Sequence, residues 1–154
     1  MQRKSVSKML TLGSRIMIAC ALLASCASAM AQSSDGRCSN RTIFGDYGAD
    51  SRGLLLPAPG VSIEFGGLTM THFDGKGNLT WVEHEVVGGN PLNPGWLAAS
   101  GTYSVNPDCT GLAVVNSPNS PVPLNLYFVV VKHGQEIHAV LDSNAISTIF
   151  IRVE

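Results

Sequence analysis

The chain has 154 residues, 45% of them hydrophobic and 14% charged, with a formal net charge of −1. All eleven acidic residues but only six of the ten basic residues follow residue 31, which leaves that part of the chain with a net charge of −5 and no basic run. This balance argues against binding to nucleic acid and against electrostatic attachment to anionic lipid, and the length fits one domain.

The first segment in chain order, residues 1–31, has the pattern of a secretory signal peptide. A head with four basic residues precedes a nine-residue apolar core at 16–24, which is too short to span a bilayer as a helix. Ala29-Met30-Ala31 then places small residues where a signal peptidase cleaves. We therefore expect an exported protein, periplasmic or secreted, that begins near Gln32.

A second interpretation of the same segment predicts a different location. Leu23-Ala24-Ser25-Cys26 resembles the lipobox of bacterial lipoproteins, in which the cysteine becomes the lipidated first residue. In that case the protein is anchored to a membrane at Cys26. The cleavage site at Ala29-Met30-Ala31 favours soluble release.

Two cysteines remain after the signal peptide. Cys38 lies in a polar lead-in at 32–42, and Cys109 lies far along the chain. Two thiols in an oxidising compartment most simply form a disulfide. There is no CxxC motif and no histidine pair at metal-ligand spacing, so we expect no metal site and no cofactor.

Residues 43–154 are expected to form a single all-β domain. Short β-prone runs alternate there with Gly, Pro, Asn and Asp, and no stretch shows a sustained helical period. The pattern predicts eight strands, at 43–50, 61–73, 78–87, 96–105, 112–116, 123–132, 135–142 and 146–153.

The connections between these strands alternate between short and long. Asp74-Gly75-Lys76-Gly77-Asn78 supplies the positive-φ residues of a tight hairpin turn, whereas the long connections mostly contain proline. This alternation predicts an eight-stranded antiparallel up-and-down barrel with one closed end and one end rimmed by stiff loops; a β-sandwich is the alternative. Cys38 and Cys109 both fall at the closed end. Such a barrel has room for side chains or one small ligand.

The first hairpin turn also predicts which residues face each other. A turn centred near Lys76 pairs Leu68 with His84 and Met70 with Val82. Because this shared face is mostly apolar, we expect it to point into the barrel. A slip by one residue would reverse every side chain.

The other face of the same hairpin carries Glu83 and Glu85, a carboxylate pair on one strand. With their neighbours inside, we expect both carboxylates to be solvated. If the faces were reversed, the pair would line the interior and become the better candidate for acid–base chemistry.

His84 is the leading candidate for ligand contact. It would lie in an apolar interior with Met70, and Tyr47 and Tyr103 could add hydroxyl groups, as in many small-molecule sites. A core histidine satisfied by a neighbouring group is the competing interpretation. No GxSxG, phosphate-binding loop or nucleophile–base pairing is present, so we assign no catalytic residue.

The predicted strand at 123–132 is apolar on both faces. We expect its outer face to be covered by another strand, by the N-terminal segment or by a second subunit in a homo-oligomer.

Three segments, Gly45-Asp46-Tyr47-Gly48, residues 73–78 and residues 101–111, resemble a set of small exported bacterial proteins. Their layout, which covers roughly residues 38–152 here, is similar to the eight-stranded barrels of allene oxide cyclases and lipocalins. The resemblance implies the barrel fold. No motif of this chain matches the catalytic residues of the cyclases.

These observations favour an exported, non-enzymatic barrel that binds a small apolar molecule through its proline-rimmed end. One alternative is a cyclase or isomerase that uses His84 as acid or base. The other is a structural or surface-interaction module with a fully packed core, and the volume of the interior distinguishes it from the first two.

Overall fold

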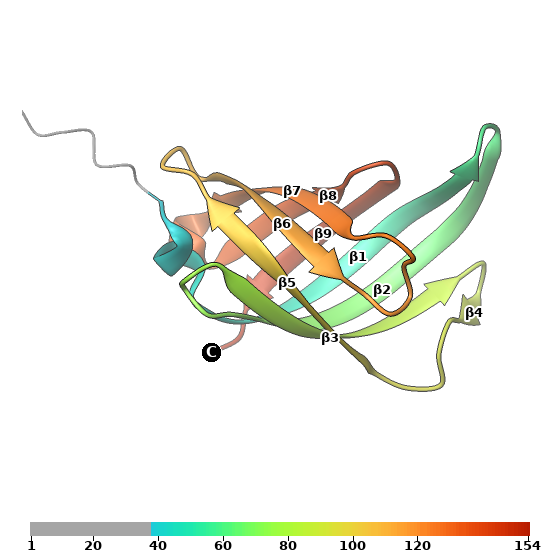
Figure 1. Cartoon of the computed structure of the whole chain (residues 1–154), viewed down its shortest axis with the longest axis horizontal. Helices are drawn as coiled ribbons and strands as arrows, with labels where there is room; N and C mark the ends of the chain where they lie inside the picture. Colours follow the sequence, from blue (N-terminus) through green and yellow to red (C-terminus); the bar gives the residue numbers. More distant parts are fainter. Residues whose placement is uncertain (1–37) are drawn as a thin grey trace, which may run out of the picture. The chain divides into compact units, whose positions relative to one another are not determined.

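Residues 38–154 are described by a computed structural model, and they form a barrel of eight antiparallel strands that closes on itself (Figure 1). Successive ring strands pair with each other, and pairing of the last with the first completes the ring. The predicted up-and-down barrel is therefore confirmed. The predicted signal peptide, Cys26 and most of the polar lead-in lie outside the described residues.

The ring consists of eight of the nine strands in this part of the chain, and a short strand, β4 (Asn90–Pro91), pairs with the end of β3 outside it. Two 3-10 turns, η1 (Asn40–Ile43) and η2 (Lys132–Gly134), lie at the closed end (Figure 1). The ring strands are β1 (Gly45–Ala58), β2 (Val61–Phe73), β3 (Asn78–Val87), β5 (Leu97–Val105), β6 (Thr110–Asn116), β7 (Leu124–Val131), β8 (Glu136–Leu141) and β9 (Ala145–Arg152).

β1 is much longer than the predicted strand at 43–50. The predicted strand ended at residue 50, but the observed strand continues through the polar residues and the glycine at 50–53. Gly53 has a φ of +152° and passes so close to β9 that a Cβ there would lie 1.9 Å from the carbonyl oxygen of Ala145. Glycine at this position therefore permits strand pairing rather than ending the strand.

The β2–β3 hairpin has the predicted pairing but the opposite face points inward. Leu68 pairs with His84 and Met70 with Val82, as expected from the turn. Met70 is nevertheless 45% exposed, whereas Glu83 is only 1% exposed. The prediction that His84 and Met70 point into the barrel is wrong. The turn determines which residues are neighbours, whereas closure of the whole ring determines which side of the sheet becomes the interior.

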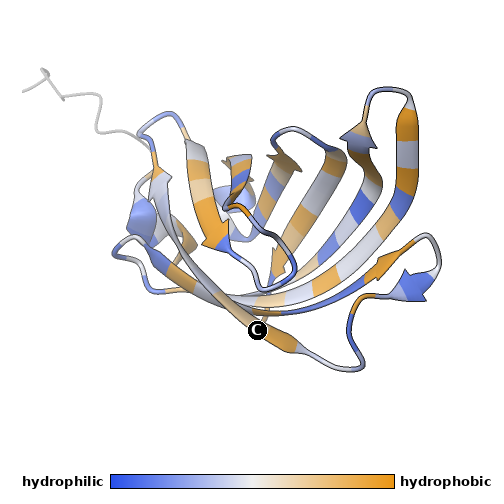
Figure 2. Cartoon of the chain, turned by 45° about the vertical axis from the view of Figure 1, so that its right-hand side comes forward, coloured by the Kyte–Doolittle hydropathy of each residue, from blue (hydrophilic) through white to orange (hydrophobic). Residues whose placement is uncertain are grey.

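Aromatic side chains fill the closed half of the barrel. The ring of Phe73 lies edge-on to Tyr47, Tyr103 and Phe150, at centroid distances of 5.4, 4.9 and 6.2 Å. A cavity of only about 10 Å³ lies among the side chains of this half. The face of β2 and β3 that bears Phe73 and Trp81 therefore supplies the side-chain volume that fills the interior. Hydrophobic and hydrophilic bands alternate along the strands (Figure 2).

A disulfide and an arginine fasten the closed end. Cys38 and Cys109 are bonded, with Cα atoms 5.0 Å apart, which confirms the predicted pair. At the end of β9, Arg152 donates hydrogen bonds to the carbonyl groups of Thr42, Phe44 and Gly134. These bonds connect β9 to both 3-10 turns and to the segment that enters β1.

The outer face of β7 is exposed in the described part of the chain. Tyr127 and Val129 both present their side chains to solvent. The prediction that another strand covers this face is wrong for residues 38–154. Coverage by the N-terminal segment or by a second subunit stays a prediction.

Candidate functional site

The open half of the barrel contains a small pocket that combines apolar walls with carboxyl and hydroxyl groups. The pocket opens to solvent and has a volume of about 40 Å³, enough for a small polar group but not for a whole ligand. The lining residues come from six strands, so only the closed ring brings them together. They are Phe65, Trp81, Leu124, Leu126, Leu141, Ile146 and Phe150 on the apolar side, and Ser51, Thr69, Glu83, Glu85 and Thr148 on the polar side.

Glu83 is the most deeply buried acidic group of this pocket. The indole Nε1 of Trp81 donates a hydrogen bond of 2.7 Å to its Oε2, and the hydroxyl of Ser117 donates to its Oε1. In residues 38–154 no Lys, Arg or His forms an ion pair with it. A carboxylate has about four acceptor positions, so two donors leave acceptor capacity for a further partner.

Glu85 lies next to Glu83 on the same face of β3. Burial raises the pKa of Glu85, and the nearby charge of Glu83 raises it further, although a hydrogen bond from Asn119 opposes both effects. Glu85 therefore keeps its proton to a higher pH than an ordinary glutamate does.

Loops at the open end hold these carboxyl groups in place. The side-chain amide of Asn119 donates to Glu85 at 2.8 Å, and Asn93 donates to the amide oxygen of Asn119 at 2.6 Å. The backbone of Asn119 also donates to the hydroxyl of Ser117. A continuous chain of hydrogen bonds thus connects β3, the β4–β5 loop and the β6–β7 loop around the mouth.

Tyr47 and Tyr103 lie inside the barrel as predicted, but at its closed end. The hydroxyl of Tyr47 donates to the carbonyl of Gly134 and accepts a 2.7 Å bond from Arg152. The hydroxyl of Tyr103 donates to the carbonyl of Asn40 and accepts from the backbone of Gly75. Burial raises the pKa of both phenols. Both hydroxyl groups serve the closure of the barrel, and neither lines the mouth pocket.

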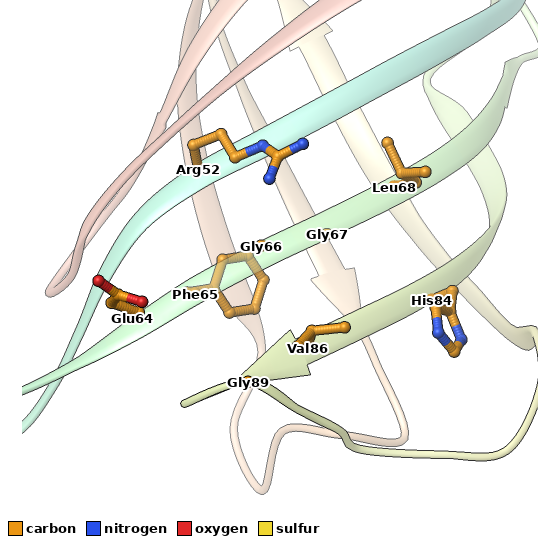
Figure 3. A pocket seen from close by; sticks show the side chains of 9 residues that line it. All are labelled: Arg52, Glu64, Phe65, Gly66, Gly67, Leu68, His84, Val86 and Gly89. Carbon is orange, nitrogen blue, oxygen red and sulfur yellow. The ribbon is translucent and has the colours of Figure 1, made fainter.

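His84 lines a groove of about 380 Å³ on the outer surface (Figure 3). Gly66 and Gly67 form the floor of this groove, and Arg52 lies across the floor from His84 (Figure 3). His84 Nδ1 donates to the carbonyl of Gly95 at 3.2 Å, and Trp96 lies nearby with its ring centroid 6.0 Å away. Met70 lies further along the same outer face.

The mouth pocket is the better candidate site. In the outer groove, Arg52 is mostly exposed and already bonded to Asp50, so its charge is screened and paired. In the mouth, by contrast, a carboxylate is buried among apolar walls with a carboxyl neighbour of raised pKa. Such perturbed groups in a pocket are typical of functional sites.

Sequence reasoning identified Glu83 and Glu85 as a pair but placed them outside. It did not find Ser117, Asn119 or Asn93, which lie in loops remote from β3 in sequence. The sequence could have indicated this site only through the opposite choice of inner face for β3, which places Glu83, Glu85 and Trp81 inside the barrel together.

Searches of protein-family models, curated proteins and solved structures found no match to this chain. The resemblance to exported bacterial barrels therefore stays a prediction. Within residues 38–154, no helix is long and apolar enough to cross a membrane, and no three His, Cys, Asp or Glu side chains are grouped to hold a metal ion.

Proposed function

We propose that this protein is an exported binding protein for a small, mainly apolar molecule that carries an amine group. The observation that carries the proposal is the Glu83–Glu85 pair, which lies in the apolar mouth of the barrel without a cationic partner among the described residues. The Cys38–Cys109 disulfide is compatible with the proposed export.

The dimensions of the pocket limit how such a ligand binds. A volume of about 40 Å³ accepts an ammonium group, while the apolar body would lie in the mouth against side chains such as Phe65, Leu124 and Leu141. The unused acceptor positions of Glu83 and Glu85 would receive the N–H groups of the ammonium.

Charge explains the preference for an amine over an alcohol or an acid. The negative charge of Glu83 contributes to the raised pKa of Glu85, and an ammonium between them would offset this repulsion. Binding should therefore favour deprotonation of Glu85, and affinity should increase as the pH rises through the pKa of Glu85. A fatty acid would bring a further negative charge into the pocket and should be rejected.

Titration calorimetry with three probes of equal chain length tests this proposal: octylamine, octanol and octanoic acid. We expect octylamine to bind most tightly and octanoic acid not to bind. Glu83→Gln, which keeps the size of the side chain, should weaken octylamine binding about tenfold or more. Glu64→Gln, an exposed change on the outer face of β2, is the matched control. Equal binding of all three probes, or unchanged binding by Glu83→Gln, would contradict the proposal.

A second function is favoured by the raised pKa of Glu85. A carboxylic acid beside a carboxylate can donate and remove protons in turn, as an isomerase or cyclase requires. In this case a molecule carried by Glu85→Gln would differ in structure from the product carried by the wild-type protein, which mass spectrometry of the bound molecules would show. If neither protein carries a molecule and octylamine does not bind, a packed structural module becomes the better interpretation.

A further inference from the structure

Three loops at the open end contain no charged residue at all. They are 88–96, 117–123 and the tip of the β1–β2 hairpin at 53–63, which lies between Arg52 and Glu64, and they hold seven of the eight prolines of the chain. The fourth connection at this end, 142–144, carries one acidic residue, Asp142. The closed end differs, because its turns contain Asp74, Lys76, Asp108 and Lys132.

Each of the three uncharged loops presents large apolar side chains to solvent. We call this set the apolar rim: Leu54, Leu56, Val61, Leu92, Trp96 and Val122. Exposed apolar groups scattered singly are ordinary, but a group of them at one end, without intervening charge, marks an interaction surface. Proline fixes φ at several positions of these loops and so limits their freedom to fold back onto the barrel.

The rim is uneven in height. β1 pairs with β9 only as far as Leu54, and β2 pairs with β3 only from Phe65 onward. Beyond these points the two strands form a ladder only with each other, with single hydrogen bonds from the backbone of Leu56 to the side chain of Asn144 and from the backbone of Gly88 to the carbonyl of Glu64. The tip of the β1–β2 hairpin therefore projects beyond the ring (Figures 1 and 2). A rigid protein partner must match such a profile in detail, whereas a fluid interface adapts to it.

We propose that the apolar rim docks on the surface of a zwitterionic lipid bilayer. Leu56 and Val122 enter the boundary between headgroups and acyl chains, and Trp96 lies at headgroup level, where its amphipathic ring is favoured. The absence of Lys and Arg from the three loops, together with Asp142 beside them, gives anionic headgroups no attraction. This proposal is independent of the ligand proposed above.

The two tryptophans of the chain provide a direct probe. Trp81 is 7% exposed inside the barrel, whereas Trp96 is 58% exposed on the rim. Phosphatidylcholine vesicles should therefore shift the tryptophan emission to shorter wavelength and sediment the protein. Trp96→Phe should abolish the spectral shift, because Trp81 is already shielded from water.

Variants identify the surface that binds. Leu56→Ser combined with Val122→Ser should weaken partitioning into phosphatidylcholine vesicles about tenfold or more. Tyr127→Ser combined with Val140→Ser removes exposed apolar groups from the outer face of the barrel and should have no effect. All proteins are produced in the same way, so that any anchor at Cys26 is common to them, and circular dichroism checks folding.

Several results would overturn the proposal. The first is a protein that does not bind phosphatidylcholine vesicles, and the second is binding that requires anionic lipid. The third is an equal loss of vesicle binding in the two double variants. If the tryptophan emission shifts to shorter wavelength as the protein concentration rises without vesicles, and light scattering shows a doubled mass, the rim binds a second copy of the chain instead.

Discussion

Replacing Arg152 with alanine removes the side chain that holds the closed end together. Its guanidinium donates to the carbonyl groups of Phe44 at 2.6 Å, Thr42 at 3.1 Å and Gly134 at 3.2 Å, and to the hydroxyl of Tyr47 at 2.7 Å. It also lies over the ring of Tyr47, 5.0 Å from its centroid. Loss of this one side chain therefore removes the hydrogen bonds that join the end of β9 to η1, to η2 and to the start of β1.

The magnitude follows from the number and kind of these bonds. A hydrogen bond from a charged donor contributes about 1.5–3 kcal/mol, but water can replace some of them at a partly buried site, and they are not additive. We expect Arg152→Ala to lower the free energy of unfolding by about 3–5 kcal/mol and Tm by about 12–20 °C. Arg152→Lys should recover about half of this loss, because an ammonium cannot reach all four acceptors.

Urea unfolding followed by circular dichroism measures both changes. Arg52→Ala is the matched control, since Arg52 is mostly exposed and bonds only Asp50, and its removal should cost less than about 1 kcal/mol. A loss below about 1 kcal/mol for Arg152→Ala, or full recovery by lysine, would refute the reasoning.

Three further changes test other parts of the fold. The folded protein binds the proton of Glu85 more tightly than the unfolded chain does, so the contribution of Glu85 to stability falls as the pH rises above the ordinary range of a glutamate. Glu85→Gln should therefore raise Tm at pH 7 and change it little at pH 4. Equal changes in Tm at the two pH values would contradict this. Hydrogen bonds from the side chain of Asn78 and from backbone donors of the β2–β3 turn lower the pKa of Asp74 from 3.8 to about 2. Asp74→Ala should therefore lower the urea midpoint at pH 7, and the difference from wild type should shrink between pH 4 and pH 2. The double change Cys38→Ser, Cys109→Ser opens a loop closed over a separation of 71 residues and should cost about 4 kcal/mol, so a protein that keeps its urea midpoint would show that this bond does not stabilise the fold.

The parts of the fold that could be predicted from sequence depend on local chemistry. The turn at 74–78 has glycines where positive φ is needed, and Asp74 accepts four hydrogen bonds within it. It therefore determines the β2–β3 pairing by itself. The alternation of tight and long connections likewise indicated the up-and-down barrel and brought Cys38 and Cys109 to the same end.

The parts that could not be predicted depend on residues far apart in the chain. The outer face of the hairpin holds Leu68, Met70 and Val82, which made it look like an inner face. The interior instead takes the face with Phe73 and Trp81, because their rings fill the space that only the closed ring defines. Arg152 escaped notice for the same reason, since two of its acceptors lie 108 and 110 residues earlier.

The pKa of Glu85, followed by carbon-detected NMR of its carboxyl group with and without octylamine, tests the central claim most directly. The proposed site predicts a raised pKa in the free protein and a clear decrease when the ammonium binds between Glu83 and Glu85. A pKa of Glu85 that octylamine leaves unchanged, at concentrations that saturate the protein, would contradict it.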